Sequence, residues 1–520
     1  MITPTIDEPK TAVAASYSPP QRRGRLFDPL AVALLAAVIG GAGASRPSLW
    51  FDESATISAS ASRSLPDLWR LLGHIDAVHG LFYLLMHGWF AVFPQTEFWS
   101  RVPSCLAIGA AAAGTVVFAK RFSSRSTAVC AGVVFAILPR VTWAGVEGRS
   151  YAFTAVAAIW LTVLLVTAIR RNRGWLWLLY AVALLLSILL NVYLVLLVPA
   201  YAVIVPVIGG RKSVVIRWAA ASAVAVAIMA PFMVFAHGQR FQVGWISRLS
   251  WHSVIDVLQH QFFDNSVPFA ILTAVILLAA LALRLTGRWE CDADTRRLLT
   301  ACAAWLVVPP TVSLIYSALT EPFYYPRYMF FTAPAMAVVT AVCIVAVARQ
   351  PRWIAAVLVL LAVAGFPNYL LSQRQRYAKE GWDYSDVADL ISAHAAPGDC
   401  LLVDNTVSWL PGPIRALLAA RPAAFRPLID IGRGMRGSER GTLWDGHVAV
   451  WLVTGRLYKC TTLWTISSHD TTLPDHQSGN SLPPGRVLRR APAYVTPSLV
   501  GFRIVERWQF HRTQVIKSTR

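Results

Sequence analysis

The sequence predicts an all-α polytopic membrane protein of about 11 transmembrane helices, followed by a C-terminal extracytoplasmic α/β domain. Of its 520 residues, 56% are hydrophobic and only 14% are charged, whereas a soluble domain has about 25% charged residues. The apolar residues form blocks of roughly 15 to 23, the length that crosses about 30 Å of hydrocarbon at about 1.5 Å per residue. Residues 372–520 differ in composition, with Pro, Gly, Asp and short β-like runs. These observations exclude a water-soluble globular enzyme.

Eleven apolar blocks are long enough to span a membrane. They are Leu30–Ala44, Val102–Ala119, Thr127–Ala144, Ala152–Ile169, Trp175–Leu190, Val192–Ile208, Val214–Ala236, Pro268–Leu283, Leu298–Leu319, Met329–Ala348 and Trp353–Leu371.

The net charge of +20 would suggest nucleic-acid binding in a soluble protein, but here the basic residues cluster between apolar blocks. The clusters are Arg22/Arg23/Arg25, Lys120/Arg121/Arg125, Arg170/Arg171/Arg173, Arg211/Lys212/Arg217, Arg284/Arg288/Arg296/Arg297 and Arg349/Arg352. With eleven spans and a cytoplasmic N-terminal tail at residues 1–27, all of them fall on the cytoplasmic side, as the positive-inside rule requires. We therefore expect a multi-pass protein of the plasma membrane with its C-terminal domain outside the cytoplasm.

One further apolar stretch, residues 81–93, is too short to span, because it would cover only about 20 Å. Counting it as a span would also place three basic clusters outside. We predict an interfacial helix here, within a first outer loop at residues 45–101. The transmembrane domain then covers residues 28–371.

In the C-terminal part, residues 372–520, the runs Cys400–Asp404 and Val448–Val453 read as strands. Asp386–Ala395 has the pattern of an amphipathic helix, and a Pro-Gly-Asp turn precedes the first strand. Cys400 and Cys460 are the cysteines of this part. They form either a disulfide, in a compartment that can be oxidising, or two buried thiols.

The first outer loop begins with two adjacent carboxylates, Asp52 and Glu53, at a membrane boundary. Carboxylates there are costly to desolvate unless they face water, a cation or a reaction. Adjacent helical side chains point about 100° apart, so the two cannot bind one proton in the same way. The alternative is structural, with Asp52 capping a helix N-terminus.

His79 and two arginines also lie at predicted outer positions. His79 begins the interfacial helix, where it either donates a hydrogen bond to a phosphate or anchors the helix. Arg149 and Arg327 lie at outer span ends, against the positive-inside bias. Each is explained either by a buried ion pair or by a lipid phosphate, which the guanidinium fork matches.

Five motifs occur in a fixed order along the chain: Leu49–Glu53, His79–Tyr83, Glu97–Ser104, Gly148–Tyr151 and Pro326–Tyr328. Together they resemble the GT-C class of membrane glycosyltransferases, which use polyprenyl-phosphate sugars as donors. The similarity is greatest to the protein O-mannosyltransferase and aminoarabinose-transferase branch, and to actinobacterial mannosyltransferases. It runs over about residues 28–370, and Trp382-Asp383-Tyr384 also recurs. At His79-Gly80-Leu81 the chain departs from the family, in which His-Pro-Pro or Lys-Pro-Pro is common.

The resemblance implies that Asp52 is the general base, with Glu53 as its catalytic neighbour. It implies that His79, Arg149 and Arg327 bind the donor phosphate, and that Tyr83, Tyr151 and Tyr328 bind substrate. One base without an enzyme nucleophile implies a single inverting displacement of a sugar, in the first place mannose, onto a glycolipid, polysaccharide or protein. The sequence requires no cofactor, leaves a divalent cation open and shows no nucleic-acid partner.

A transporter or flippase of lipid-linked sugars is the alternative from a different functional class. Transporters typically have ionisable residues in the cores of their spans and a matching pair of broken half-helices. The predicted spans contain no Lys, Glu or Asp in their cores and no such pair of half-helices. The ionisable residues lie at span ends instead, which favours the enzyme.

Overall fold

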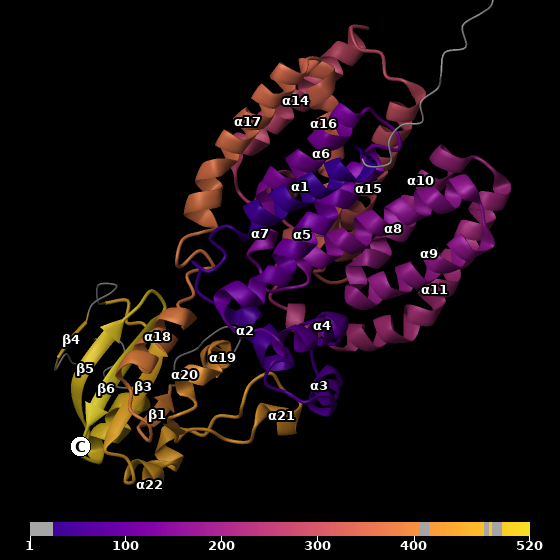
Figure 1. Ribbon diagram of the computed structural model, residues 1–520. Helices are drawn as coiled ribbons and strands as arrows, with labels where there is room; N and C mark the ends of the chain where they lie inside the picture. The colour runs from indigo at the N-terminus through magenta and orange to yellow at the C-terminus, as the bar shows by residue number, and fades with distance from the viewer. Residues whose placement is uncertain (1–23, 405–414, 473–477, 481–490) are drawn as a thin grey trace, which may run out of the picture.

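The computed structural model describes residues 24–404, 415–472, 478–480 and 491–520. Most of the predicted N-terminal tail, residues 1–23, lies outside this range. A long helical bundle forms one end of the molecule, and a mixed sheet with short helices forms the other (Figure 1). The bundle helices are α1 (Gly24–Gly41), α5 (Glu97–Ala119), α6 (Arg125–Ile137), α7 (Pro139–Gly145), α8 (Tyr151–Arg171), α9 (Gly174–Leu190), α10 (Leu197–Gly209), α11 (Lys212–Gly238), α14 (Val267–Leu285), α15 (Ala293–Leu319), α16 (Ala333–Ala348) and α17 (Pro351–Pro367).

Each of the eleven predicted spans is helical, but not all have the length of a straight span. In the described chain, eight helical segments are long and apolar enough to cross a membrane. A ninth candidate is the pair α6–α7, which is bent by 61° where Pro139 starts α7 and cannot donate a backbone hydrogen bond. The other two predicted spans correspond to α1 and α9, which are shorter apolar helices. The chain is thus a multi-pass membrane protein, and the total of eleven stays a prediction.

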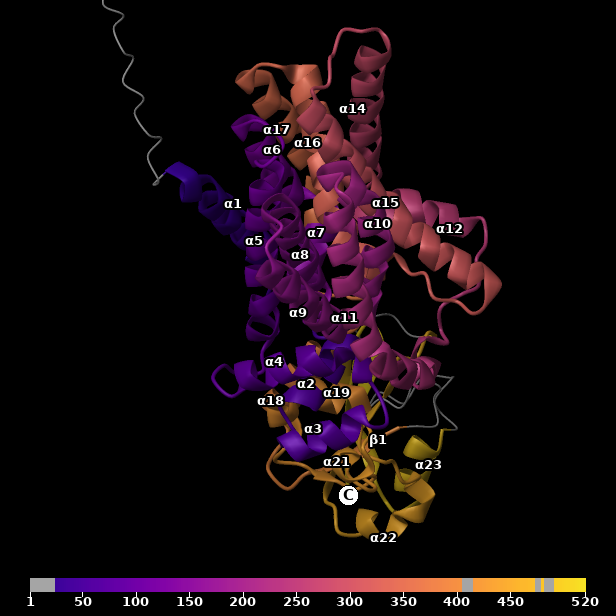
Figure 2. The same ribbon diagram turned by 90° about the vertical axis from the view of Figure 1, so that its right-hand side faces the viewer.

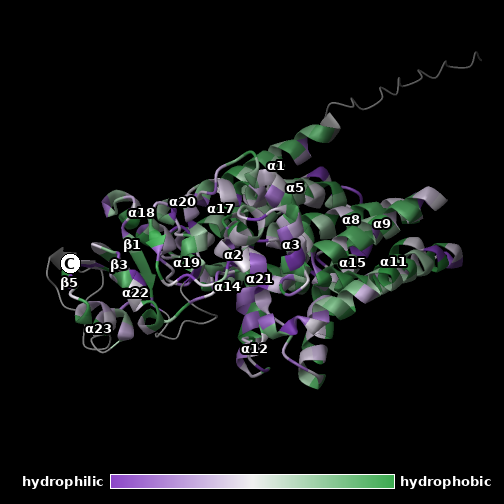
Figure 3. Ribbon diagram, turned by 90° about the horizontal axis from the view of Figure 1, so that it is seen from below, coloured by the Kyte–Doolittle hydropathy of each residue, from purple (hydrophilic) through white to green (hydrophobic). Residues whose placement is uncertain are grey.

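Small residues bring the central helices of the bundle close together. A Cβ on Gly109 of α5 would lie 2.8 Å from the Ala33 carbonyl oxygen of α1, and one on Gly132 of α6 would lie 2.5 Å from a Val116 methyl. Such close backbone approach is typical of helix contacts in membranes. The peripheral helices α11, α14 and α17 instead bury only about a fifth of their apolar segments inside the protein. Hydrophobic residues run along the bundle helices (Figure 3).

The predicted first outer loop forms three helices at one end of the bundle: α2 (Phe51–Ser60), α3 (Leu65–Leu72) and α4 (Gly80–Phe90). They lie between the bundle and the C-terminal sheet (Figure 2). Helix α4 occupies the position of the predicted interfacial helix. Its 11 residues extend about 17 Å, too short to cross a bilayer.

Between α11 and α14 the chain forms the short helices α12 (His252–Ile255) and α13 (Gln261–Phe263). The C-terminal helices are α18 (Tyr384–His394), α19 (Arg415–Ala420), α20 (Pro422–Phe425), α21 (Gly437–Arg440), α22 (Thr454–Leu457) and α23 (Pro492–Leu499). The strands are β1 (Cys400–Val403), β2 (Ile429–Asp430), β3 (Thr462–Ser468), β4 (Ser478–Asn480), β5 (Arg503–Gln509) and β6 (Thr513–Thr519). They form one sheet in the order β2-β1-β3-β6-β5-β4, in which β1 pairs in parallel with β2 and β3 and the remaining pairs are antiparallel.

Two predicted elements of this part are confirmed and one is wrong. Helix α18 corresponds to the predicted Asp386–Ala395 helix, and strand β1 to the predicted Cys400–Asp404 strand. Of the two alternatives left open for Cys400 and Cys460, the structure has the disulfide. The predicted strand at Val448–Val453 is instead a 3-10 turn over Val450–Leu452. Val450 and Val453 are buried while Trp451 and Leu452 are exposed, a spacing of three that suits a helical turn and not the alternation of a strand.

Contacts from the C-terminal part fix the helix that carries the two carboxylates. Helix α19 packs on α2 and buries Leu417 in the shared core. Ser385 of α18 accepts a hydrogen bond at 2.9 Å from the amide of Leu49, which lies just before α2. Arg421 forms an ion pair of 2.7 Å with Glu97 at the start of α5. Helix α2 is therefore held by the packing of α19 and, just before its first residue, by the hydrogen bond to Ser385.

Candidate active site

The Glu53 side chain is buried and fully engaged by neighbouring groups. Arg101 of α5 donates to its two carboxylate oxygens at 2.7 and 2.6 Å, and the Gly148 amide donates to Oε1 at 2.9 Å. Glu53 and Arg101 have side-chain exposures of 1% and 0%. A bidentate pair in such burial is a structural link, and it fixes the start of α2 against α5 and the turn before α8.

Asp52 faces the other way from its neighbour. It lies in the first turn of α2, whose N-cap residue is Trp50, so the interpretation of Asp52 as a helix cap is wrong. Its Oδ2 lies 3.7 Å from Nη2 of Arg327, and its side chain keeps 18% exposure. Of the two adjacent carboxylates, Asp52 is the one that stays partly exposed, beside Arg327.

Arg149 is held at the same site by its anchored turn and by three acceptors. The turn is fixed because the Gly148 amide bonds Glu53 and the Gly148 carbonyl accepts from Thr56 at 2.9 Å. The guanidinium contacts Tyr83 Oη and His79 Nε2, each at 3.0 Å, and reaches the Asp52 carbonyl at 3.4 Å.

His79 acts as the acceptor in its contact with Arg149, since a guanidinium has only donors. Burial lowers the pKa of His79 well below its usual value of 6.5, and the charges of Arg149 and Arg327 act in the same direction. The imidazole is therefore neutral, with its proton on Nδ1, and Nδ1 is buried without a hydrogen-bond partner among the described residues. This N–H is a donor available to a ligand.

Tyr83 links Arg149 to a buried acid. Its hydroxyl donates to Asp76 Oδ2 at 2.7 Å while accepting from Arg149. Asp76 has a left-handed backbone, φ 60°, and burial raises the pKa of its carboxyl. In this structure Tyr83 is a positioning residue for Arg149.

Arg327, at the start of the segment before α16, lies among aromatic rings. Its guanidinium carbon is 5.0 to 5.9 Å from the ring centroids of Tyr325, Trp245, Trp50 and Tyr328. Its side chain is 11% exposed, and its Nε has no hydrogen-bond partner in the described part of the chain. Buried guanidinium groups are normally fully hydrogen-bonded, so Arg327 has donor capacity left for an anion.

The two remaining sequence-predicted residues, Tyr151 and Tyr328, line the same site. Their ring centroids are 6.2 Å apart, and Tyr328 also lies 5.0 Å from the ring of Tyr193. The structure thus brings Asp52, His79, Tyr83, Arg149, Tyr151, Arg327 and Tyr328 together, and it separates Glu53 from them.

Sequence reasoning missed several residues of this site. Glu147 accepts from Trp50 Nε1 at 2.8 Å and forms a buried ion pair of 2.6 Å with Lys379. Lys379 and Glu380 belong to the segment after α17, and Trp245 to the loop after α11. In the sequence, Lys379 and Glu380 are visible only as a Lys-Glu pair after the last predicted span. Such a pair cannot be distinguished from an ordinary polar linker.

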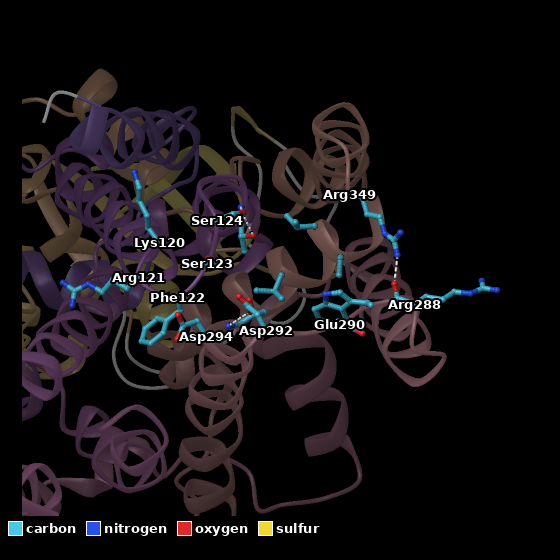
Figure 4. A pocket seen from close by; sticks show the side chains of 16 residues that line it. Lys120, Arg121, Phe122, Ser123, Ser124, Arg288, Glu290, Asp292, Asp294 and Arg349 are labelled. Carbon is cyan, nitrogen blue, oxygen red and sulfur yellow. Dashed lines mark hydrogen bonds between the residues drawn. The ribbon is translucent and has the colours of Figure 1, made fainter. Parts of the chain in front are cut away.

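Among the described residues, no group of three or more His, Cys, Asp or Glu side chains could hold a metal ion. A cleft of about 630 Å³ lies elsewhere, at the C-terminal end of α5. Helix α5 is about 35 Å long, and the candidate site is at its N-terminal end. It is lined by charges of both signs, among them Lys120, Arg288, Glu290 and Asp292 (Figure 4). This cleft contains none of the residues of the candidate site.

No protein-family model matches the chain, and no curated protein sequence matches it. Among solved structures, it is similar to ArnT from Cupriavidus metallidurans in the apo state, with a TM-score of 0.53 and 13% identity over 95% of this chain and 98% of that one. The same protein bound to undecaprenyl phosphate gives a TM-score of 0.52 and 12% identity over 96% and 98%. The apo oligosaccharyltransferase from Archaeoglobus fulgidus covers 86% of this chain and 70% of its own at 12% identity, with a TM-score of 0.47. The likeness to ArnT shows that this chain has a GT-C-like fold.

Proposed function

We propose that the protein is a membrane glycosyltransferase that moves a sugar from a polyprenyl-phosphate donor to a hydroxyl group of an acceptor outside the cytoplasm. The observation that supports it most is the placement of Asp52 beside Arg149 and Arg327, two buried guanidinium groups with donor capacity left over. The neighbour of the same fold, ArnT, has been solved with undecaprenyl phosphate bound. The resemblance of the motifs indicates mannose as the sugar and a glycolipid, polysaccharide or protein as the acceptor.

In this proposal Asp52 takes the proton from the acceptor hydroxyl as the oxygen attacks the anomeric carbon. The bond between the anomeric carbon and the phosphate oxygen breaks, and its electron pair stays on the lipid phosphate. Because Glu53 is held by Arg101, Asp52 is the carboxylate that acts as the base. The acceptor oxygen attacks the sugar directly, so no enzyme nucleophile is needed. A single displacement inverts the anomeric configuration.

The leaving phosphate gains negative charge as its bond to the sugar breaks. Arg149 and Arg327 are the groups proposed to stabilise this charge, in a site where burial strengthens electrostatic interactions. The Nδ1–H of neutral His79 would add a third donor. Tyr83 holds Arg149 in place, and Tyr151 and Tyr328 provide ring faces for the sugar.

The same proposal places the site at the outer face of the membrane. The helical part, residues 28–371, would be the catalytic domain, and residues 372–520 a domain outside the cytoplasm that stabilises α2. A reporter enzyme fused after Arg520 should be active only outside the cytoplasm. Activity only inside would overturn this orientation.

The experiment that tests the function is direct. Purified protein in nanodiscs is incubated with a panel of polyprenyl-phosphate sugars and candidate acceptors, and consumption of each donor is followed. Consumption of one donor with transfer of its sugar is expected. Flux of lipid-linked sugar across proteoliposomes, without consumption, would show a transporter instead.

A further inference from the structure

Glu380 lies beside the candidate site in an unusual backbone conformation. Its φ is +53°, in the left-handed region that residues with a Cβ rarely adopt. The next residue, Gly381, is also left-handed, with φ +81°. Strained conformations of this kind persist where the surrounding structure enforces them, and they are frequent at functional sites.

Both neighbours of Glu380 are firmly anchored. Lys379 forms its ion pair with Glu147 at side-chain exposures of 3% and 0%. The Gly381 carbonyl is 2.8 Å from His511 Nδ1, and its amide donates to the Tyr377 carbonyl at 3.0 Å. The segment therefore fixes the backbone from which the Glu380 side chain extends.

The Glu380 side chain extends toward Arg327. Glu380 Oε1 lies 3.9 Å from Nη1 of Arg327, while Asp52 lies near the other terminal nitrogen, Nη2. Glu380 is 61% exposed and Arg327 only 11%. One terminal nitrogen of Arg327 thus faces Asp52, the proposed base, and the other faces Glu380, whose carboxylate is exposed to solvent.

We propose that Glu380 competes with the lipid phosphate for Arg327 and thereby promotes release of the product lipid phosphate after sugar transfer. This inference rests on the proposed function. The donor is a phosphodiester with one negative charge, whereas the product is a phosphomonoester with a charge of about −1.5 to −2 at pH 7. Two buried arginines would therefore bind the product more tightly than the donor. A nearby carboxylate repels both ligands, and it lowers the affinity for the more highly charged product by the larger factor.

The expected effects follow from this difference in charge. Removing the Glu380 carboxylate should tighten binding of the phosphomonoester by about five-fold or more, the effect of one unit charge at about 4 Å in a water-like dielectric. Binding of a phosphodiester with one charge should tighten less. Steady-state turnover should fall, because product release becomes slower, while the KM for the donor changes little or decreases.

Full-length protein in nanodiscs is the material for the test, and undecaprenyl phosphate and its methyl ester are the probes. The variants are Glu380→Gln and Glu380→Gly; the second also relieves the left-handed backbone, so it is expected to fold. The control is Glu290→Gln, an exposed carboxylate of the cleft at the other end of the bundle. Both Glu380 variants should bind undecaprenyl phosphate more tightly, with a smaller change for the methyl ester and no change in the control.

Two results would overturn the inference, and they are distinguishable. If the unmodified protein binds both probes and the Glu380 variants bind them equally well or more weakly, the inference alone is wrong. If the unmodified protein binds neither probe, the proposed function is wrong and the inference falls with it.

Discussion

Glu53 is bonded to Arg101 through both of its carboxylate oxygens, at 2.7 and 2.6 Å, inside a core where both side chains are almost fully buried. Its neighbour Asp52 faces Arg327 instead. Two adjacent acidic residues of one helix turn thus have different surroundings. On this ground we propose different tasks for them, with Glu53 stabilising the fold and Asp52 accepting a proton.

The Glu53–Arg101 pair should therefore matter for stability. Glu53→Gln leaves the buried Arg101 with backbone carbonyls but without its charged partner, and the loss of one member of a buried pair costs about 3–5 kcal/mol. The melting temperature in detergent should fall clearly. The double variant Glu53→Gln/Arg101→Met should recover part of the loss, since no buried charge is left unpaired. An unchanged melting temperature in Glu53→Gln would show that the pair has no structural role.

Arg327 should be sensitive to the shape of its cation as well as to its charge. Arg327→Lys keeps the positive charge but removes the planar fork that stacks on rings and matches phosphate oxygens. Affinity for undecaprenyl phosphate should fall by about ten-fold or more, as for the loss of a charge-assisted hydrogen bond. Arg352→Lys is the matched control, because that guanidinium also lies over a ring, Trp353, at the other end of the bundle. An equal effect in both variants would argue against a phosphate role.

His79 makes the stability of the protein depend on pH. In the unfolded chain its imidazole takes up a proton below about pH 6.5, whereas burial, with Arg149 and Arg327, lowers the pKa of the native side chain well below that value. The free energy of unfolding should therefore fall as the pH drops below about 6.5, by up to about 1.4 kcal/mol per unit. His79→Gln can still accept from Arg149 but does not titrate, so thermal unfolding from pH 7.5 to 5 should show a smaller decrease. Identical pH profiles would contradict the neutral, buried imidazole.

The disulfide between Cys400 and Cys460 should form in protein purified without reductant. Mass spectrometry after alkylation should find neither thiol modified. Cys460→Ser should lower the stability of the C-terminal part by about 2–4 kcal/mol. Complete alkylation of both cysteines would show two free thiols instead.

Much of the bundle could be predicted because continuous apolar blocks have few alternatives in a membrane. The bend between α6 and α7 was visible only as Pro139 within an apolar block, and the turn at Val450–Leu452 was misread because short apolar runs fit a strand as well as a helical turn. Asp52, Arg149 and Arg327, which the structure brings together, could be singled out because charges at span ends are exceptional. Lys379, Glu380 and Trp245 were not, because their approach to the site depends on how segments distant in sequence pack together.

The role proposed for Asp52 as the base of a sugar transfer is tested by the variant Asp52→Asn. Asn keeps the shape and hydrogen bonding of the side chain but cannot accept the proton, so turnover with the consumed donor should fall by about 10² or more. Binding of undecaprenyl phosphate should be retained, since Arg149 and Arg327 stay in place. Turnover and binding of undecaprenyl phosphate are measured on one preparation of Asp52→Asn, and we expect turnover to be lost while binding is intact. Near-normal transfer by Asp52→Asn would show that Asp52 is not the base.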